Sequence, residues 1–319
     1  MKMLKQSLIG LSLLLPLACI AKSYPEQPIR LIVPYAAGGG TDIAARMVAQ
    51  ELSPRLEQTI IVENKAGAAT QIGTTQVVRA KPDGYTLLMG TANLATNTAF
   101  YDNLPYSVSR DLTAVIQITD VPVYIFVSTD SPIKDFASLI VAAKKGESLT
   151  YATAGVGSIP HLAGEIFSRE AKLNISHVPY KGSSEAVIAL ISGQVAFSVD
   201  NLPPAYGQVK AGRIKPLAIA AKKRSLTFPD IPTLEELGYP VEASSWWGVM
   251  APAGTPEKII TKLNTEIGAV IAEPKVRNYF IEQGMNPVGG SPQQFTQHIA
   301  AETNKWQKTV KDADIKIGN

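Results

Sequence analysis

Two glycine-containing stretches of this chain combine residue types that can hold an anion. The first reads PYAAGGGTD over residues 34–42, and the second reads ATAGVGSIPHLAGE over residues 152–165. Each follows an apolar, strand-like run and precedes a helical pattern, so its glycines lie where a helix begins. The first turn of a helix offers unpaired N–H groups and a partial positive charge, which attract carboxylates and phosphates. Either stretch alone fits an ordinary strand-to-helix turn better, but the pair favours a cleft with one anion-binding loop on each side.

Parallel α/β sheets bind ligands at the carboxyl ends of their strands, so residues near those ends are the candidates for ligand contact. The candidate ligand-binding residues are Tyr35, Gly39, Gly40, Thr41, Asp42, Thr91, Asn93, Thr153, Gly155, Gly157, Ser158, Tyr180 and Asp200. Asp42 could cap its helix or accept a hydrogen bond from a ligand, and Asp200 could cap the next helix or contact the ligand. Lys181 is the only basic residue that we expect near the cleft.

The residue sets that carry catalysis, metal binding or nucleotide binding are missing from the sequence. G-x-G-x-x-G fails because Pro160 stands where the third glycine belongs, and neither G-x-x-x-x-G-K-[ST] nor G-x-S-x-G occurs. The three histidines, His161, His177 and His298, do not have metal-site spacing. His161 is expected to make local hydrogen bonds rather than to act as a base. We therefore predict no catalytic residue, no metal and no cofactor.

The elements that must position these loops alternate between strand and helix. Strands are predicted at residues 29–33, 59–64, 85–90, 123–128, 149–153, 175–180, 195–200 and 215–221. Helices are predicted at residues 41–52, 70–79, 135–145, 158–170, 183–192 and 204–211. Short apolar strands between helical patterns indicate parallel-rich sheets with helices on both faces. The last third, with helices predicted at 256–272, 274–282 and 292–310, is expected to form a helical cap without strands.

Two extended, proline-bounded segments, residues 119–132 and 244–256, suggest chain crossings between two lobes. We predict a first lobe of residues 24–120 with 248–319 and a second lobe of residues 121–247. Two crossings make a hinge, so the cleft between the lobes can close around a ligand. Trp246 and Trp247 lie on the return crossing, where one of them could wall the cleft or pack in the hinge.

The N-terminus, residues 1–23, has the pattern of a secretory signal peptide. A positive start precedes the apolar run SLIGLSLLLPLACIA, and small residues follow, so we expect cleavage after Ala21 or Ser23. Cys19, the only cysteine, could instead be a lipid-attachment site. Removal of Lys2, Lys5 and Lys22 leaves 27 of the 30 basic residues against 27 acidic ones. A protein near zero net charge has no electrostatic footprint for nucleic acid.

The chain resembles a known family through motifs spread in order over nearly all of the expected mature sequence. They include YPEQPIRLIVPYAAGGGTDIAAR, NKAGAATQIGT, KPDGYTLL, GVGSIPHLAGE, VPYKGSSEAVIALISGQV, DNLPPA, FPDIPTLEELGYP and WWGVMAPAGTP. These are similar to the Bug family, the periplasmic solute-binding proteins of tripartite tricarboxylate transporters.

The resemblance implies a two-lobed periplasmic-binding-protein fold of class α/β and a small carboxylate as ligand. It implies that the loops at Gly38–Asp42 and Gly155–Ser158 clasp the carboxylate, often through bridging waters. It also implies a large and a small membrane subunit as partners, and we expect a monomer. Two alternatives stay open, a secreted enzyme with Asp42 or His161 as acid or base, and a ligand-sensing subunit for a receptor kinase. The identity of the acid, aliphatic or aromatic, does not follow.

Overall fold

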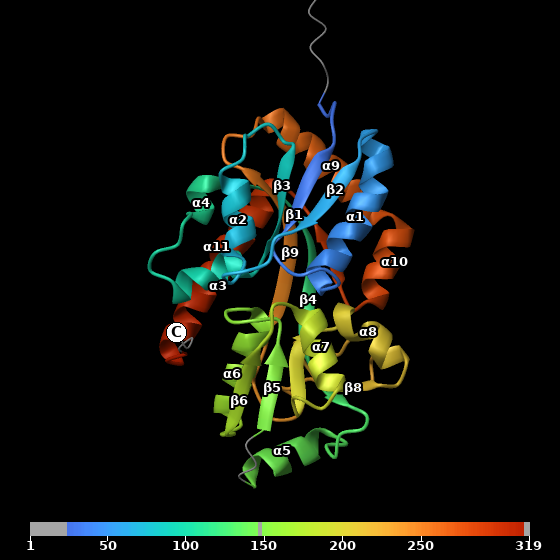
Figure 1. Cartoon of the computed structure of the whole chain (residues 1–319), viewed down its shortest axis with the longest axis vertical. Coiled ribbons are helices and arrows are strands. Elements are labelled where there is room, and N and C mark those ends of the chain that lie inside the picture. Colours follow the sequence, from blue (N-terminus) through green and yellow to red (C-terminus); the bar gives the residue numbers. More distant parts are fainter. Residues whose placement is uncertain (1–23, 146–148, 316–319) are drawn as a thin grey trace, which may run out of the picture.

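The computed structural model describes residues 24–145 and 149–315, so the predicted signal peptide lies outside the described residues. The fold is α/β and two-lobed, as predicted. The strands are β1 (Ile29–Val33), β2 (Ile60–Asn64), β3 (Thr86–Thr91), β4 (Leu112–Ser128), β5 (Leu149–Thr153), β6 (Ile175–Pro179), β7 (Phe197–Asn201), β8 (Ile214–Ala220), β9 (Ser244–Pro252) and β10 (Asn286–Gly289). Figure 1 shows β1, β2 and β3 in the upper lobe and β5 and β6 in the lower lobe.

The helices lie between these strands and cover the sheets. They are α1 (Gly40–Leu56), α2 (Gln71–Val78), α3 (Asn93–Phe100), α4 (Val108–Asp111), α5 (Phe136–Lys144), α6 (Ile159–Glu170), α7 (Ser183–Ile191), α8 (Pro203–Lys210), α9 (Glu257–Ala272), α10 (Pro274–Glu282) and α11 (Pro292–Asp312). In the part of the chain that the structure describes, no helix combines the length and apolarity that a membrane crossing requires.

The sheets are parallel at their outer strands and antiparallel at the centre. In the upper lobe β1 pairs in parallel with β2 and β3, and in the lower lobe β5 pairs in parallel with β6 and β7. Strands β4 and β9 then pair antiparallel with each other and with their neighbours. The parallel strands are apolar runs such as IRLIV because helices bury both of their faces.

Strand β4 is the longest strand of the described chain and belongs to both sheets. Its 17 residues pair with β9 from Leu112 to Pro122 and with β8 from Val123 to Ser128. The two segments predicted as extended crossings are therefore parts of two strands that pair with each other. In Figure 1, β9 and β4 run lengthwise through the middle of the molecule.

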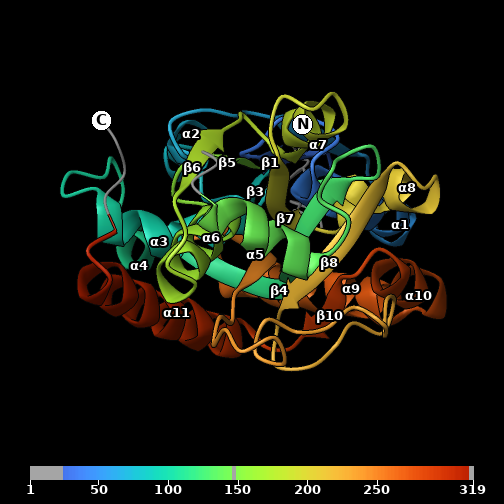
Figure 2. The same ribbon diagram turned by 90° about the horizontal axis from the view of Figure 1, so that it is seen from below.

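The C-terminal third is not purely helical, so the prediction of a cap without strands is wrong. Strand β10 separates α10 from α11 and pairs antiparallel with β4. Its sequence, NPVG, is too short to produce an alternating pattern, which is why the periodicity did not indicate it. The helices themselves follow the sequence, because the apolar stripe of α9 is buried. Figure 2 shows α11, α9 and α10 along one side of the molecule.

Candidate functional site

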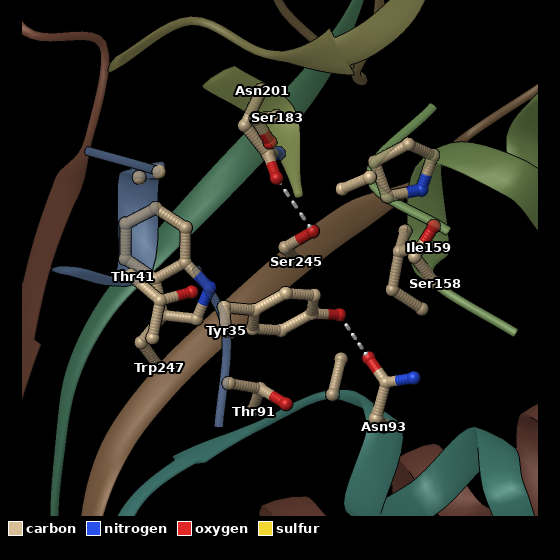
Figure 3. A pocket seen from close by; sticks show the side chains of 15 residues that line it. Tyr35, Thr41, Thr91, Asn93, Ser158, Ile159, Ser183, Asn201, Ser245 and Trp247 are labelled. Carbon is tan, nitrogen blue, oxygen red and sulfur yellow. Dashed lines mark hydrogen bonds between the residues drawn. The ribbon is translucent and has the colours of Figure 1, made fainter. Parts of the chain in front are cut away.

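A cavity of about 430 Å³, open solvent included, lies where loops from both lobes meet. Figure 3 shows the side chains around it. The lining residues are Tyr35, Gly39, Gly40, Thr41, Thr91, Ala92, Asn93, Ala154, Ser158, Ile159, Pro160, Ser183, Asn201, Ser245 and Trp247. None of these fifteen lining residues carries a formal charge.

Four helices begin at residues that line this cavity. The first residues of α1, α3, α6 and α7 are Gly40, Asn93, Ile159 and Ser183. A helix N-terminus carries about half a positive charge and N–H groups without intrahelical acceptors. Four N-termini around one uncharged cavity therefore create a positive potential there without any lysine or arginine.

The first glycine loop is held by a carboxylate behind it. Gly38 adopts φ +76°, a conformation that glycine reaches without strain, and donates its N–H to Asp42 Oδ2 at 2.9 Å. Arg46 donates to the same oxygen, and Asn64 Nδ2 donates to the other at 2.9 Å. Gly39, the N-cap, has no side chain to accept the N–H groups of the first helical turn. The N–H groups of Gly40, Thr41 and Asp42 therefore have no acceptor among the described residues.

Asp42 is 3% exposed and does not line the cavity. It holds the loop from behind instead of presenting its carboxylate to a ligand. Burial raises the pKa of its carboxyl, but hydrogen bonds from Arg46, Gly38 and Asn64 outweigh burial and lower the pKa overall. The group is ionised at neutral pH, and the three donors compensate its charge.

The second glycine loop has the same backbone geometry but a neutral support. Gly157 adopts φ +74° and donates its N–H to His161 Nδ1 at 3.2 Å. Ser158, the N-cap, accepts the N–H of His161 and donates its hydroxyl to Gly155 O at 2.7 Å. Its own N–H donates to Gly155 O, and Pro160 has no N–H to offer. In the first turn of α6, the N–H of Ile159 stays open toward the cavity.

Two stacked histidines stand behind the second loop. The rings of His161 and His177 lie 4.1 Å apart, and His177 Nε2 is 2.7 Å from Thr153 Oγ1. Burial lowers the pKa of His161, with Glu165 opposing it, and burial together with His161 lowers the pKa of His177 to about 3. Both rings are neutral at pH 7, so His161 Nδ1 keeps the lone pair that accepts the Gly157 N–H. His161 is thus a local hydrogen-bonding residue, as the sequence predicted.

Two buried polar groups of the lining have no hydrogen-bond partner among the described residues. Thr91 Oγ1 and Asn93 Nδ2 are buried and unpartnered, although each residue is only 3% exposed. Asn93 Oδ1 accepts from the Tyr35 hydroxyl at 2.7 Å, which leaves its amide hydrogens unused (Figure 3). A hydroxyl and an amide nitrogen can both donate, so these two groups are available for hydrogen bonds to a ligand.

On the other side of the cavity, two serine hydroxyls are already bonded to the protein. Ser183 Oγ donates to Asp200 Oδ1 at 2.9 Å, and Ser245 Oγ donates to Asn201 Oδ1 at 3.0 Å. Asp200 is fully buried, which raises the pKa of its carboxyl to about 7 despite hydrogen bonds from Asn201 and Ser183. Asp200 therefore acts on the cavity through Ser183.

The two lobes touch through their loops in this structure. Thr96 at the start of α3 donates to Gly157 O at 2.6 Å, and Ser184 Oγ donates to Ala37 O at 3.1 Å. The backbone of the first loop also packs closely on Trp247, since a Cβ on Gly40 would lie 2.5 Å from Trp247 Cη2. Trp247 walls the cavity, whereas Trp246 packs against Phe295 at 5.4 Å.

The structure brings about half of the predicted site residues into the lining. Those lining the cavity are Tyr35, Gly39, Gly40, Thr41, Thr91, Asn93 and Ser158; those behind it are Asp42, Thr153, Gly157 and Asp200. Gly155, Tyr180 and Lys181 line a second hollow of about 970 Å³, open solvent included, which shares Tyr35, Asn93 and Ala154 with the cavity. This hollow adjoins the cavity. Within residues 24–145 and 149–315, no cluster of His, Cys, Asp and Glu could hold a metal ion.

Sequence reasoning missed Ser183, Asn201 and Ser245 as lining residues. A signal for Ser183 was present, because KGSSE follows a strand and opens a helix as the two recognised loops do. Asn201 adjoins the candidate Asp200, but only the pairing of β4 with both β7 and β9 places it beside Ser245.

The chain is similar to proteins of one family over most of its length. Residues 44–315 match TctC, described as the tripartite tricarboxylate transporter family receptor. The protein BugT of Bordetella pertussis is 37% identical over 302 residues, which are 93% of this chain and 92% of BugT. The solved structure of R. palustris Rpa4515 with adipate has a TM-score of 0.89 at 36% identity, covering 92% of this chain and 99% of that one. The periplasmic binding protein BugD has a TM-score of 0.88 at 34% identity, with coverage of 92% and 99%.

Proposed function

This chain belongs to the tripartite tricarboxylate transporter receptor (TctC) family of solute-binding proteins, and from that premise we propose that it captures a small organic carboxylate between its lobes and delivers it to such a transporter. The observation that carries the proposal is the uncharged cavity at which α1, α3, α6 and α7 begin. Open N–H groups of the first helical turns, with Thr91 and Asn93, supply donors for carboxylate oxygens. Adipate in the relative Rpa4515 supports the same ligand class.

Binding rather than catalysis is the function that the polar groups support. Asp42 and His161, the two groups considered as acid or base, hold the loops through their own hydrogen bonds. The family and fold are likewise those of binding proteins. We infer export to the periplasm from the signal-peptide pattern of residues 1–23 and from the relatives.

The sharpest test compares a carboxylate ligand with its amide. An acid identified by native mass spectrometry from an organic-acid library is titrated calorimetrically beside the corresponding carboxamide. The amide places an N–H₂ donor against N–H donors, so losing one or two charged hydrogen bonds should weaken binding roughly 10- to 1,000-fold. Equal affinities for acid and amide would refute the carboxylate site.

Delivery to membrane subunits needs a separate measurement. Vesicles that contain the large and small subunits of the transporter should accumulate the labelled acid only when this protein is added. Binding without uptake would favour a ligand-sensing role over transport.

We also propose that the lobes are residues 24–120 with 248–319 and residues 121–247, joined by a hinge at residues 119–123 and 244–249. The hinge lies where β4 leaves its pairing with β9 and enters its pairing with β7 and β8. Small-angle scattering should show a smaller radius of gyration with ligand bound, and an unchanged radius at saturation would contradict the hinge.

A further inference from the structure

Each glycine loop accepts a hydrogen bond from a hydroxyl of the opposite lobe. Ser184 of α7 donates to Ala37 O in the first loop at 3.1 Å, and Thr96 of α3 donates to Gly157 O in the second loop at 2.6 Å. Figure 1 shows α3 at the lower end of the upper lobe and α7 at the upper end of the lower lobe. The two bonds therefore cross the interface between the lobes in opposite directions.

Both accepting carbonyls belong to peptide groups that are also held at their N–H end. The peptide group of Ala37 O includes the Gly38 N–H, which donates to Asp42 Oδ2 at 2.9 Å. The peptide group of Gly157 O includes the Ser158 N–H, which donates back into its own loop at 3.3 Å. Hydrogen bonds at both ends fix the orientation of a peptide group. Each hydroxyl therefore helps to hold the loop of the other lobe just before its helix begins.

Small residues allow α7 to approach the first loop closely. A Cβ on Gly38 would lie 3.1 Å from Ser184 Oγ, and a Cβ on Gly182, the N-cap of α7, would lie 3.3 Å from Ala36 Cβ. Both distances are shorter than ordinary contacts, so a larger residue at either position would push the lobes apart. The contact between the lobes is therefore built around these hydrogen bonds.

Neither hydroxyl lines the ligand cavity. Thr96 lies one helical turn after the lining residue Asn93, and Ser184 directly follows the lining residue Ser183. Thr96 is fully buried, whereas Ser184 is half-buried. A ligand in the cavity therefore contacts neither hydroxyl, and the two bonds form or break with the relative position of the lobes.

We propose that Thr96 and Ser184 are positioning residues that form a latch between the lobes and stabilise their closed arrangement. The inference rests on the proposed carboxylate-binding function and hinge, and it adds two residues that set affinity without touching the ligand. A ligand that requires closed lobes binds with its intrinsic dissociation constant divided by the closed fraction. Loss of the latch lowers the closed fraction, so the affinity for every ligand falls by one common factor.

The bond of Thr96 should contribute more to the latch than the bond of Ser184. It is buried, and its 2.6 Å length lies at the short end of the range for hydroxyl donors. Thr96→Val leaves Gly157 O buried without this donor and places a methyl group against it, so affinity should fall roughly tenfold or more. Ser184→Ala removes an exposed bond, and its loss should weaken binding about two- to threefold.

Matched variants separate the latch from general effects on folding. Thr98→Val makes the same change two residues further along α3, where the hydroxyl donates to Ala95 O and accepts from Gln307 Nε2 within the first lobe. It should bind ligands as the unaltered protein does. Thr96→Ser keeps the latch hydroxyl and should keep most of the affinity. Thermal unfolding of each variant checks its folding.

The decisive measurements use the double variant Thr96→Val with Ser184→Ala. Succinate, glutarate and adipate serve as probes, in calorimetry and in stopped-flow fluorescence of Trp247, which walls the cavity. The dissociation constant of each probe that binds should rise by the same factor, roughly 20-fold or more if the two losses multiply. Faster dissociation should account for most of it, because the lobes must open before the ligand leaves.

Small-angle scattering tests the latch without any ligand. The ligand-free double variant should have a larger radius of gyration than ligand-free Thr98→Val, because fewer of its molecules are closed. With a saturating probe the two variants should have the same radius.

The outcomes separate the latch from the proposed function. If the double variant has the affinities, dissociation rates and ligand-free radius of Thr98→Val, the latch is overturned while carboxylate binding stands. If the loss of affinity differs from probe to probe, the two residues act on the ligand inside the cavity, and their positioning role is overturned. If no probe binds to the unaltered protein, the choice of carboxylates fails, and an unchanged ligand-free radius of the double variant then overturns the latch as well.

Discussion

The two glycine loops share one backbone design and differ in what they leave for a ligand. Gly38 and Gly157 have φ values of +76° and +74°, and each donates its N–H to a side chain four residues ahead. The first loop has a glycine N-cap and keeps its helix N–H groups open, whereas in the second loop Ser158 accepts the N–H of His161, Pro160 has none, and only that of Ile159 remains. Loop shape and donor supply are therefore set by different residues, and we expect the first loop to contribute most of the hydrogen bonds to the ligand's carboxylate.

The largest difference in ligand affinity between the two loops should appear when the first residue of each helix is substituted. Gly40→Val should weaken carboxylate binding more than 100-fold, because even its Cβ would lie 2.5 Å from Trp247, which walls the cavity. The second loop already has a β-branched residue at the equivalent position, so Ile159→Val should change affinity less than about tenfold. Calorimetry on both variants measures this, with thermal unfolding as the check on folding. Similar losses of affinity in both variants would show that the two loops do not differ at this position.

Exchanging the N-caps should move affinity and stability in opposite directions. Gly39→Ser gives α1 a capping side chain and raises the free energy of unfolding by a few tenths of a kcal/mol. The same hydroxyl accepts a helix N–H that would otherwise donate to the ligand. Binding should therefore weaken about 10-fold or more. A Cβ at Gly39 comes no closer than 3.5 Å to Ala36 O, so Gly39→Ala is the steric control and should bind nearly normally.

The reverse change in the second loop completes the exchange. Ser158→Gly should lower the free energy of unfolding while affecting affinity less than Gly39→Ser does, because the Ser158 hydroxyl is bonded inside its loop. Chemical denaturation and calorimetry give both quantities. If Gly39→Ser bound as tightly as the unaltered protein, the open donors of the first loop would not be the ones that hold the carboxylate.

Acid should loosen the second loop before the first. Burial lowers the pKa of His161 and His177, so the stability that their neutral forms provide is complete above about pH 6.5. It is lost as the pH falls toward about 3, the pKa of His177. The pKa of Asp42 is lowered by its hydrogen-bond donors, which outweigh burial, so its contribution is lost only below the ordinary value of 3.8.

Amide NMR of ¹⁵N-glycine-labelled protein distinguishes the two loops. At the pH, below 6.5, where His161 becomes protonated, the Gly157 resonance should shift, since a protonated His161 Nδ1 cannot accept its N–H, while the Gly38 resonance stays constant. His298→Asn, which alters a histidine of α11 packed on Trp246, should leave this behaviour unchanged. Parallel titration of Gly38 and Gly157 would contradict the difference between their supports.

The smallest effect should come from Lys181, a basic residue of the adjoining hollow. Lys181 lines the adjoining hollow rather than the cavity, so Lys181→Gln should change affinity less than about twofold. Enclosed hydrogen bonds are little screened, and affinity should stay almost constant between low and high salt. Titrations at two ionic strengths measure both, and a steep salt dependence that Lys181→Gln removes would assign charge recognition to Lys181.

Periodicity and loop composition predicted most elements and the two glycine loops that line the cavity. The runs IRLIV and LTYAT are strands over the predicted residues, and both glycine loops open helices. Helix α3, NLATNTAF, was not predicted because it lacks a hydrophobic stripe and follows Ala92, which cannot cap. Yet it brings Asn93 into the cavity.

The direction of the hydrogen bonds in the site could not be predicted in the same way. Ser158 was a candidate hydroxyl donor to a ligand, but its proton goes to Gly155 O. Which hydroxyls and N–H groups stay open depends on partners such as His161 and Asn201, which only the tertiary structure places. Sequence patterns report which face of an element is buried, whereas hydrogen-bond direction depends on contacts between elements.

The continuity of β4 through both sheets has a mechanical consequence. A paired strand resists stretching and transmits torsion, so rotation of one lobe against the other should twist β4 and β9 without melting the ladder between Leu112 and Pro122. The irregularities in that ladder, at 114/116 and 117/119, concentrate twist on the first-lobe side. Amide protons along the ladder should then exchange as slowly in the open protein as in the closed one. The resting angle between the lobes would then be set by the twist of a paired strand rather than by a flexible linker.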